Sequence, residues 1–178
     1  MSWDVAGSLS PVAAYVGLGS NLGDGPVQLA AARKAVSALA GVRLTAASSL
    51  HRTEPQGFRD QPFFTNQVLE LACARTVSPL SLLDMMLAVE NSLGRIRKNG
   101  VRFGPRTLDL DLLLFGNEVM VSERLTLPHP RLLERAFVLV PLAELAPDRI
   151  LPQGLSVSAA LGRLRYRRQG DIIYQDAM

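Results

Sequence analysis

Cysteine is almost absent from this chain of 178 residues, in which Cys73 stands alone. One thiol excludes an intramolecular disulfide and any metal cluster built on cysteines. Cys73 lies in the apolar stretch VLELACA, which favours a buried and unreactive thiol. A chain without a disulfide framework is expected in the cytoplasm.

Long apolar runs are lacking too, since no run approaches the roughly 20 apolar residues that span a bilayer. We therefore expect no membrane association. Residues 1–11 have neither the charged start nor the apolar centre of a signal peptide and are expected to form a flexible leader. Apolar residues nevertheless make up 48% of the chain, which is enough for a hydrophobic core. No repeat, low-complexity tract or linker divides the sequence, so a single domain over 1–178 is expected.

Lysine is scarce, because Lys34 and Lys98 are the only two. The basic charge is carried mainly by arginine, whose rigid fork of five donors suits phosphate and carboxylate groups. The net charge of +3 is small, so the clustering of the arginines matters more than their number. The phosphate-binding motif GxxxxGK followed by Ser or Thr is absent as well, which excludes a Walker-type nucleotide site.

Apolar periodicity predicts elements in the order strand, helix, strand, strand, helix, strand. The strands are expected over 12–19, 42–51, 67–74 and 108–116, and the helices over 27–40 and 78–94. Asp24 and Ser78 are the expected helix N-caps. A hairpin-like passage over 117–130 and one or two short helices over 132–147 follow. This order is typical of an α+β fold, in which helices pack on one face of an antiparallel sheet.

The segment 52–66 contains two prolines and a glycine and is too irregular for a helix or a strand. We predict a long loop here, and loops of this length are often functional. Its aromatic residues Phe58, Phe63 and Phe64 either fill the core or stack against a flat heterocycle, whose edge Asn66 would then contact. The pattern alone leaves both interpretations open.

Asp109 and Asp111 lie two residues apart in a predicted strand, so both carboxylates project from one face, roughly 7 Å apart. Leu108, Leu110 and Leu112 then point into a core on the other face. Two adjacent carboxylates repel unless a cation lies between them, and Mg²⁺ typically binds one or two protein carboxylates together with substrate phosphates. A solvated strand face with arginine partners is the alternative.

Five basic residues precede the aspartates without an intervening acid: Arg95, Arg97, Lys98, Arg102 and Arg106. Most charge runs form solvated surface loops. A run of cations beside a carboxylate pair also fits a polyphosphate that arginines hold on one side and Mg²⁺ bridges on the other. His129 lies between two prolines and near Arg131 and Arg135, where a structural role and a phosphate contact are both open.

Three blocks of the sequence resemble the 6-hydroxymethyl-7,8-dihydropterin pyrophosphokinases of folate biosynthesis: YVGLGSN, RTEPQGFRDQPFFTN, and LGRIRKNGVRFGPRTLDLDLLLFGN with the following LTLPHPRLLERAFVLVPLAELAP. The resemblance covers residues 13–152 and leaves 153–178 as a tail outside it. It implies a ferredoxin-like α+β fold with an additional C-terminal hairpin and helices. It also implies that pyrophosphate passes from ATP to the hydroxymethyl group of the pterin, with release of AMP.

The resemblance implies roles for individual residues. Asp109 and Asp111 would bind two Mg²⁺ ions. The residues implied in catalysis are Arg95, Arg97, Arg102, Arg106, Asp109 and Asp111. The implied ATP contacts are Arg97, Lys98, Arg106, Leu112, Thr126, His129 and Arg135. The implied pterin contacts are Thr53, Glu54, Gln56, Phe64, Asn66, Phe103 and Phe137.

Two aromatic residues depart from the family pattern. Phe103, which would close over the pterin, stands where many members have tryptophan, so the stacking surface is kept and the indole N–H is lost. Phe64 replaces a frequent tyrosine and likewise keeps the ring. The expected partners are ATP and the pterin, with the chain acting as a monomer that binds neither nucleic acid nor membrane.

Two other functions are compatible with an arginine-rich α+β domain. An RNA-binding module would place exposed aromatic residues on the strands of its sheet, whereas the strand LDLDLLLFG presents carboxylates that repel a phosphate backbone. A catalytically silent ligand-binding or regulatory domain would have no need of the carboxylate pair. The sequence therefore favours the enzyme.

Overall fold

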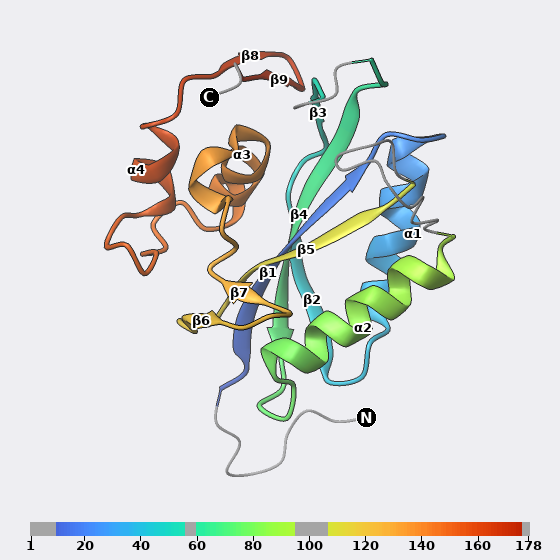
Figure 1. Ribbon diagram of the computed structural model, residues 1–178, viewed down its shortest axis with the longest axis vertical. Coiled ribbons are helices and arrows are strands. Elements are labelled where there is room, and N and C mark those ends of the chain that lie inside the picture. Colours follow the sequence, from blue (N-terminus) through green and yellow to red (C-terminus); the bar gives the residue numbers. More distant parts are fainter. Residues whose placement is uncertain (1–9, 56–59, 95–106, 176–178) are drawn as a thin grey trace.

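The computed structural model describes residues 10–55, 60–94 and 107–175, and a seven-stranded sheet lies at their centre (Figure 1). The strand order is β5-β1-β4-β3-β9-β8, and β2 pairs with β4 beside β3. Among these described strands, β3 and β9 pair in parallel and the other neighbours are antiparallel. The strands are β1 (Val12–Ser20), β2 (Val42–Ala47), β3 (His51–Thr53), β4 (Phe64–Cys73), β5 (Asp109–Phe115), β8 (Arg167–Gln169) and β9 (Ile172–Tyr174).

The remaining elements surround this sheet. A small hairpin of β6 (Met120–Val121) and β7 (Thr126–Leu127) lies beside β5, as predicted for 117–130. The helices are α1 (Gly25–Ser37), α2 (Pro79–Ser92), the 3₁₀ turn η1 (Leu132–Glu134), α3 (Ala136–Leu145) and α4 (Val157–Leu161). In the described part of the chain, no helix has the length and apolar character needed to cross a membrane.

The helices α1 and α2 begin at the predicted N-caps. The Asp24 side chain accepts a hydrogen bond from the main-chain N–H of Val27 at 3.1 Å. Ser78 and Ser81 form a capping box, in which each side chain accepts from the other residue's main-chain N–H. These bonds satisfy amides that the first turn of a helix leaves without partners, so both predicted starts are confirmed.

Helices cover both faces of the sheet, α1 and α2 on one and α3 and α4 on the other (Figure 1). Ala14, Val16 and Leu18 of β1 pack with α1 and α2, whereas Tyr15 of the same strand packs with α3 and α4. The prediction of helices on one face is therefore correct for α1 and α2, and the additional C-terminal helices, for which no face was predicted, cover the other. The reason is that the nearly all-apolar α3 needs a buried site on both sides, and the second face of the sheet supplies one.

Cys73 lies in the core under α1 and α2, and burial raises the pKa of its thiol to about 11. A thiol with so high a pKa is almost entirely uncharged at neutral pH and is a poor nucleophile. The prediction of a buried thiol is confirmed.

The prediction of a long loop over 52–66 is wrong at both ends of the segment. Its first residues belong to β3 and its last belong to β4, because Thr53 and Phe64 pair across these strands. The expected single strand over 42–51 is instead divided into β2 and β3. Ser48 separates them: its main-chain N–H donates to the carbonyl of Val68 at 2.9 Å, and its hydroxyl accepts from the N–H of Val68 at 3.0 Å.

The C-terminal segment, which the family resemblance does not cover, joins the main sheet. β9 adds to the free edge of β3, and β8 continues as a hairpin beyond it. Ile173 of β9 packs against Ala136 and Val140 of α3. The segment therefore connects the edge of the sheet with the helix that covers its second face.

Candidate active site

The side chains of Asp109 and Asp111 lie on the face of β5 that is directed toward α3. Leu110 and Leu112, the alternate residues of the strand, are buried with α1 and α2, as predicted. Asp109 lies opposite Gly19 on the neighbouring strand β1, and Asp111 lies opposite Gly17. Because glycine has no side chain, β1 places no group between the carboxylates of β5 and the polar residues of β4.

The glycine at position 19 also permits a close approach from β4. A Cβ atom there would lie 3.1 Å from Oδ1 of Asn66, which is tighter than an ordinary contact. Asn66 is 6% exposed and donates a hydrogen bond from Nδ2 to the Thr53 hydroxyl of β3 at 2.8 Å. A row of side chains therefore runs across the sheet face from the carboxylates of β5 to an amide and a hydroxyl at the other side.

Arg135, immediately before α3, brings a cation to this face. Its Nη1 atom lies 3.8 Å from Oδ2 of Asp111, and its guanidinium lies 5.4 Å from the centre of the Phe137 ring. Burial lowers the pKa of Arg135, nearby Arg131 adds to this effect, and Asp111 and Asp109 oppose it. Arginine keeps its charge under such conditions, so the site contains a partly buried cation beside the carboxylates.

His129 is fixed between β5 and η1. Its main-chain N–H donates to the Leu113 carbonyl at 2.9 Å, and its Nδ1 accepts from the Arg131 N–H at 3.1 Å. Burial, followed by the charges of Arg135 and Arg131, lowers the pKa of His129 from 6.5 to about 4. The ring is therefore neutral at pH 7, and with Nδ1 accepting, its proton lies on Nε2.

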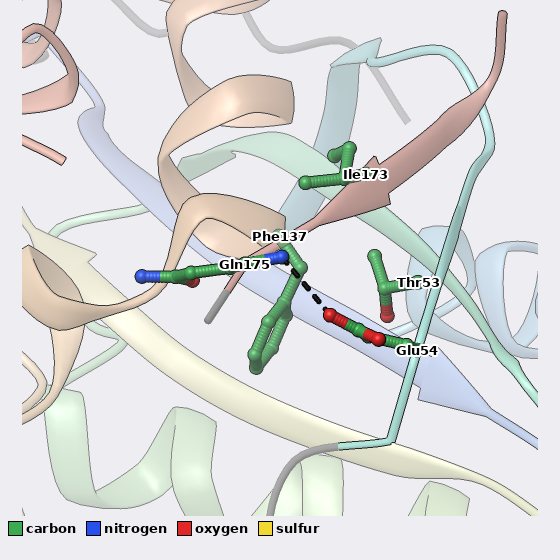
Figure 2. A pocket seen from close by; sticks show the side chains of 5 residues that line it. All are labelled: Thr53, Glu54, Phe137, Ile173 and Gln175. Carbon is green, nitrogen blue, oxygen red and sulfur yellow. Dashed lines mark hydrogen bonds between the residues drawn. The ribbon is translucent and has the colours of Figure 1, made fainter. Parts of the chain in front are cut away.

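A small pocket lies where β3, β9 and α3 meet. Its lining consists of Thr53, Glu54, Phe137, Ile173 and Gln175 (Figure 2). The main-chain N–H of Gln175 donates to Oε1 of Glu54 at 3.3 Å. Three of these five residues are among the implied pterin contacts, and Phe64 lies across from Thr53 in the adjacent strand.

Glu90 of α2 contacts β5 from the opposite face of the sheet, at the residue between the two aspartates. It is 1% exposed, and its Oε1 atom accepts a hydrogen bond from the main-chain N–H of Leu110 at 2.7 Å. Leu110 lies between the two aspartates, so this bond fixes the main chain of β5 at the point where both carboxylates leave it.

The structure thus places many of the implied residues on one sheet face or beside it. Thr126 lies in β7, next to β5. The side chain of Leu112 is buried in the core under α1 and α2, so only its main chain can contact a nucleotide. Seven implied residues lie outside the described part of the chain: Gln56, Arg95, Arg97, Lys98, Arg102, Phe103 and Arg106.

Sequence reasoning missed Ile173 and Gln175 of the C-terminal segment. The apolar pair Ile172 and Ile173 after the glycine turn at Gly170 could have indicated a strand. No local signal marks Gln175, because its role depends on partners that lie far away in the sequence.

A divalent cation is the cofactor to test against this geometry. Among the described residues, no group of three or more His, Cys, Asp or Glu side chains is arranged to hold a metal ion. The pair Asp109 and Asp111 supplies hard oxygen donors on one face, opposite two glycines. That donor set fits Mg²⁺, which commonly uses one or two carboxylates and takes its other ligands from water and substrate phosphates.

Residues 15–147 match the family model described as 7,8-dihydro-6-hydroxymethylpterin-pyrophosphokinase (HPPK). A 2-amino-4-hydroxy-6-hydroxymethyldihydropteridine pyrophosphokinase of Haemophilus influenzae is 47% identical over 141 residues, which are 79% of this chain and 86% of that protein. The protein of the same name from Pseudomonas aeruginosa is 49% identical over 140 residues, 79% of this chain and 84% of that protein.

The fold is also similar to that of a solved structure. The HPPK-DHPS of Plasmodium falciparum, in its wild-type form with pteroate, superposes with a TM-score of 0.67 at 12% identity. The match covers 97% of this chain and 48% of that one, so the chain spans about half the length of the solved protein. At this identity the likeness concerns the fold alone.

Proposed function

The chain belongs to the 7,8-dihydro-6-hydroxymethylpterin-pyrophosphokinase family, and from this premise we propose how the residues of its site divide the work. The protein is an ATP-dependent transferase. It transfers pyrophosphate from ATP to the hydroxymethyl group of 6-hydroxymethyl-7,8-dihydropterin in folate biosynthesis, and AMP is released. The assignments to individual residues below are our proposals.

Asp109 and Asp111 are proposed to hold Mg²⁺, and we propose two ions. The support is their position on one face of β5, opposite Gly17 and Gly19, with Arg135 as the neighbouring cation. The bound metal would supply neutralisation of the charge that builds on the phosphate oxygens during the reaction. Glu90 would keep the main chain between the two carboxylates in place.

The triphosphate is proposed to lie between the carboxylates and Arg135. Arg135 would bind phosphate oxygens, because its guanidinium is already beside Asp111 and a fork of donors suits phosphate. His129 would donate from Nε2, since its Nδ1 is occupied by the Arg131 N–H. Thr126, the main chain of Leu112 and the basic run Arg95, Arg97, Lys98, Arg102 and Arg106 complete the proposed ATP contacts.

The pterin is proposed to bind at the opposite side of the face, by β3 and α3. Asn66 and Thr53 offer an amide and a hydroxyl that are already hydrogen-bonded to one another. Phe137 lines the pocket there, and its ring supplies an apolar surface for a flat heterocycle (Figure 2). Glu54, Gln56, Phe64 and Phe103 complete the proposed pterin contacts.

In this arrangement the pterin hydroxyl attacks the β-phosphorus in line with the bond to the α-phosphate, and AMP leaves with the bridging oxygen. Phosphoryl chemistry depends mainly on positioning and charge stabilisation. The residues described above therefore act by holding two substrates at opposite sides of one rigid sheet face. The lack of a side chain at Gly19, between Asp109 and Asn66, would allow the reacting groups to meet over β1.

Four strands lie in the order β5-β1-β4-β2, with α1 connecting β1 to β2 and α2 connecting β4 to β5. This arrangement supports a ferredoxin-like core to which the later elements are additions. We further propose that the chain is a single domain, acts as a monomer and works in the cytoplasm. The support is the continuous sheet, to which even β8 and β9 belong, and the buried thiol of Cys73.

One observation carries the site assignment: the carboxylate pair, the partly buried Arg135 and the amide–hydroxyl pair lie on or beside the same face of one sheet. AMP release from MgATP, measured with and without 6-hydroxymethyl-7,8-dihydropterin, tests it. We expect pterin-dependent AMP from the wild type and none from Asp111→Ala, with the fold of the variant unchanged by circular dichroism. Substantial turnover by the folded variant would contradict the site, and ADP in place of AMP would contradict the reaction.

A further inference from the structure

We propose that Gln175 is a positioning residue for the transfer reaction, because its side-chain amide fixes the main chain on both sides of Arg135. The proposal rests on the function proposed above, in which Arg135 binds the phosphates of ATP. Gln175 lies beyond residues 15–147, the part of the chain that the family model matches. Its role is therefore a property of this chain's C-terminal segment.

The side chain of Gln175 makes two hydrogen bonds that flank Arg135. Its Oε1 atom accepts from the main-chain N–H of Ala136 at 2.7 Å, and its Nε2 donates to the carbonyl of Glu134 at 2.7 Å. Both groups of the amide are thus used on the residues directly before and after the arginine. Gln175 itself is only 8% exposed, so water does not readily replace these bonds.

Gln175 takes the place of a helix cap. Arg135 is the N-cap residue of α3, but its side chain makes no capping bond, and its backbone is extended at φ −118° and ψ 107°. The first amide of the helix, that of Ala136, is fully buried and must find a partner within the protein. Gln175 provides it, and the extended conformation that this leaves at Arg135 directs its guanidinium to Asp111.

The segment that carries Gln175 is firmly attached. β9 pairs with β3, and the main-chain N–H of Arg52 donates to the carbonyl of Asp171 at 2.9 Å. Ile173 is 1% exposed and packs against α3. The glutamine is therefore held from a rigid strand and can restrain the loop between η1 and α3.

The same residue connects the two halves of the proposed site. Its main-chain N–H holds Glu54 beside the pocket, while its side chain turns away toward η1 and α3 (Figure 2). Thr53, Glu54 and Phe137 line that pocket. Gln175 thus lies between the pterin contacts and the arginine that we assign to the phosphates.

Steady-state kinetics of Gln175→Ala, well below its melting temperature, test the proposal. We expect KM for MgATP to rise and kcat to fall, with kcat/KM lower by about 10-fold to 100-fold, the range found when residues that orient a functional group are lost. Two controls separate this from general destabilisation. Gln169→Ala changes an exposed glutamine of β8, and Val36→Ala removes buried volume in α1, on the other face of the sheet from the arginine; both should keep the wild-type constants.

A double-mutant cycle identifies the route of the effect. If Gln175 acts through Arg135, then Gln175→Ala should change KM for MgATP little further in the Arg135→Ala background, giving strong non-additivity. Additive effects, or wild-type constants for Gln175→Ala, would overturn the proposal. Absence of pterin-dependent AMP from the wild type would instead refute the proposed function, so the two failures are distinguishable.

Gln175→Glu offers a pH-dependent readout of the bond between the side chain and the Glu134 carbonyl. A protonated glutamic acid can donate to the Glu134 carbonyl as the glutamine does, whereas the carboxylate repels it. The activity of this variant, expressed relative to wild type at each pH, should therefore recover as the pH falls. A ratio that is independent of pH would count against the proposal.

Discussion

The two faces of the central sheet are built by the same strands but use their side chains differently. Leu110 and Leu112 of β5 pack with α1 and α2, while Asp109 and Asp111 occupy the other face beside Arg135. The first face is a continuous apolar core and contributes stability through buried area. The second face combines an apolar region under α3 with a row of polar and charged groups.

The polar groups of the second face are held by specific partners. Asn66 donates a hydrogen bond to the Thr53 hydroxyl. Nε2 of the buried His51 lies 2.7 Å from Oε1 of Glu144 in α3. Buried polar groups destabilise a fold unless they are hydrogen-bonded. The comparison therefore teaches that one face is used for burial alone, while the other combines a second apolar core under α3 and α4 with polar groups held at defined positions.

The largest expected effect is the loss of catalysis in the variant Asp111→Asn. The amide cannot neutralise a metal ion, so kcat should fall by about a thousandfold or more, equal to roughly 4 kcal/mol in activation free energy. The free energy of unfolding should change little, because relief of the repulsion from Asp109 offsets the lost ion pair with Arg135. Asp148→Asn, on an exposed residue, is the matched control. If Asp111→Asn lost much stability but kept a normal kcat, Asp111 would have a structural role, and the catalytic role assigned to its face of the sheet would be wrong.

The neighbouring residue should show the opposite behaviour. Leu110→Ala removes a side chain that is 6% exposed and should lower the free energy of unfolding by about 2–4 kcal/mol. The folded fraction should keep KM and kcat close to wild type, since the side chain points away from the site. Chemical denaturation and kinetics on the same sample measure both. Unchanged stability would contradict the burial assigned to this face.

A smaller effect is expected for Thr53→Val, which keeps the shape of the side chain and removes its hydroxyl. Asn66 then lacks its 2.8 Å partner, so unfolding free energy should fall by about 1–3 kcal/mol. KM for the pterin should rise by about 10-fold, which is roughly 1.4 kcal/mol, and KM for MgATP should not change. Thr45→Val, at an exposed position of β2, is the control. An increase confined to the KM for MgATP would place the two substrates the other way round.

The remaining expected effect concerns stability rather than turnover and is the pH dependence that His129 contributes. Its pKa is lowered from 6.5 to about 4 on folding, so the unfolded chain binds more protons between these values. Stability should therefore fall as the pH decreases from about 6.5 to 4, and His129→Gln should weaken this dependence. The NMR titration of the ring gives the pKa directly. A midpoint near 6.5 in the folded protein would be inconsistent with the burial seen here.

MgATP should raise the same pKa if His129 lies against the phosphates. A bound polyanion favours the protonated imidazole. The titration repeated with MgATP thus tests the phosphate contact independently of turnover. An unchanged midpoint would leave His129 with a structural role only.

Much of the first face could be predicted from sequence, because alternation and capping are local signals. Leu108 to Leu112 alternate with the aspartates, and the N-caps Asp24 and Ser78 were identified from their residue types. The relation of Asp109 and Asp111 to one another follows from the two-residue period of a strand.

The second face was less predictable, since its contacts join distant segments. Gln175 acts on Ala136, and Arg135 on Asp111, over separations that no local pattern encodes. The division of 42–51 into β2 and β3 likewise depends on the bond between Ser48 and Val68. The family resemblance predicts which residues form the site, but only the fold relates them to the C-terminal segment.

The most direct test of the polar face is a crystal structure with Mn²⁺, the pterin and an ATP analogue that has a methylene group between the α- and β-phosphorus atoms. This analogue blocks the bond that the reaction breaks, and Mn²⁺ can be located by its anomalous scattering. We predict metal within direct coordination distance of the carboxylates of Asp109 and Asp111, with Arg135 on the phosphates. Metal bound elsewhere, while Arg135 remains paired with Asp111, would contradict the account.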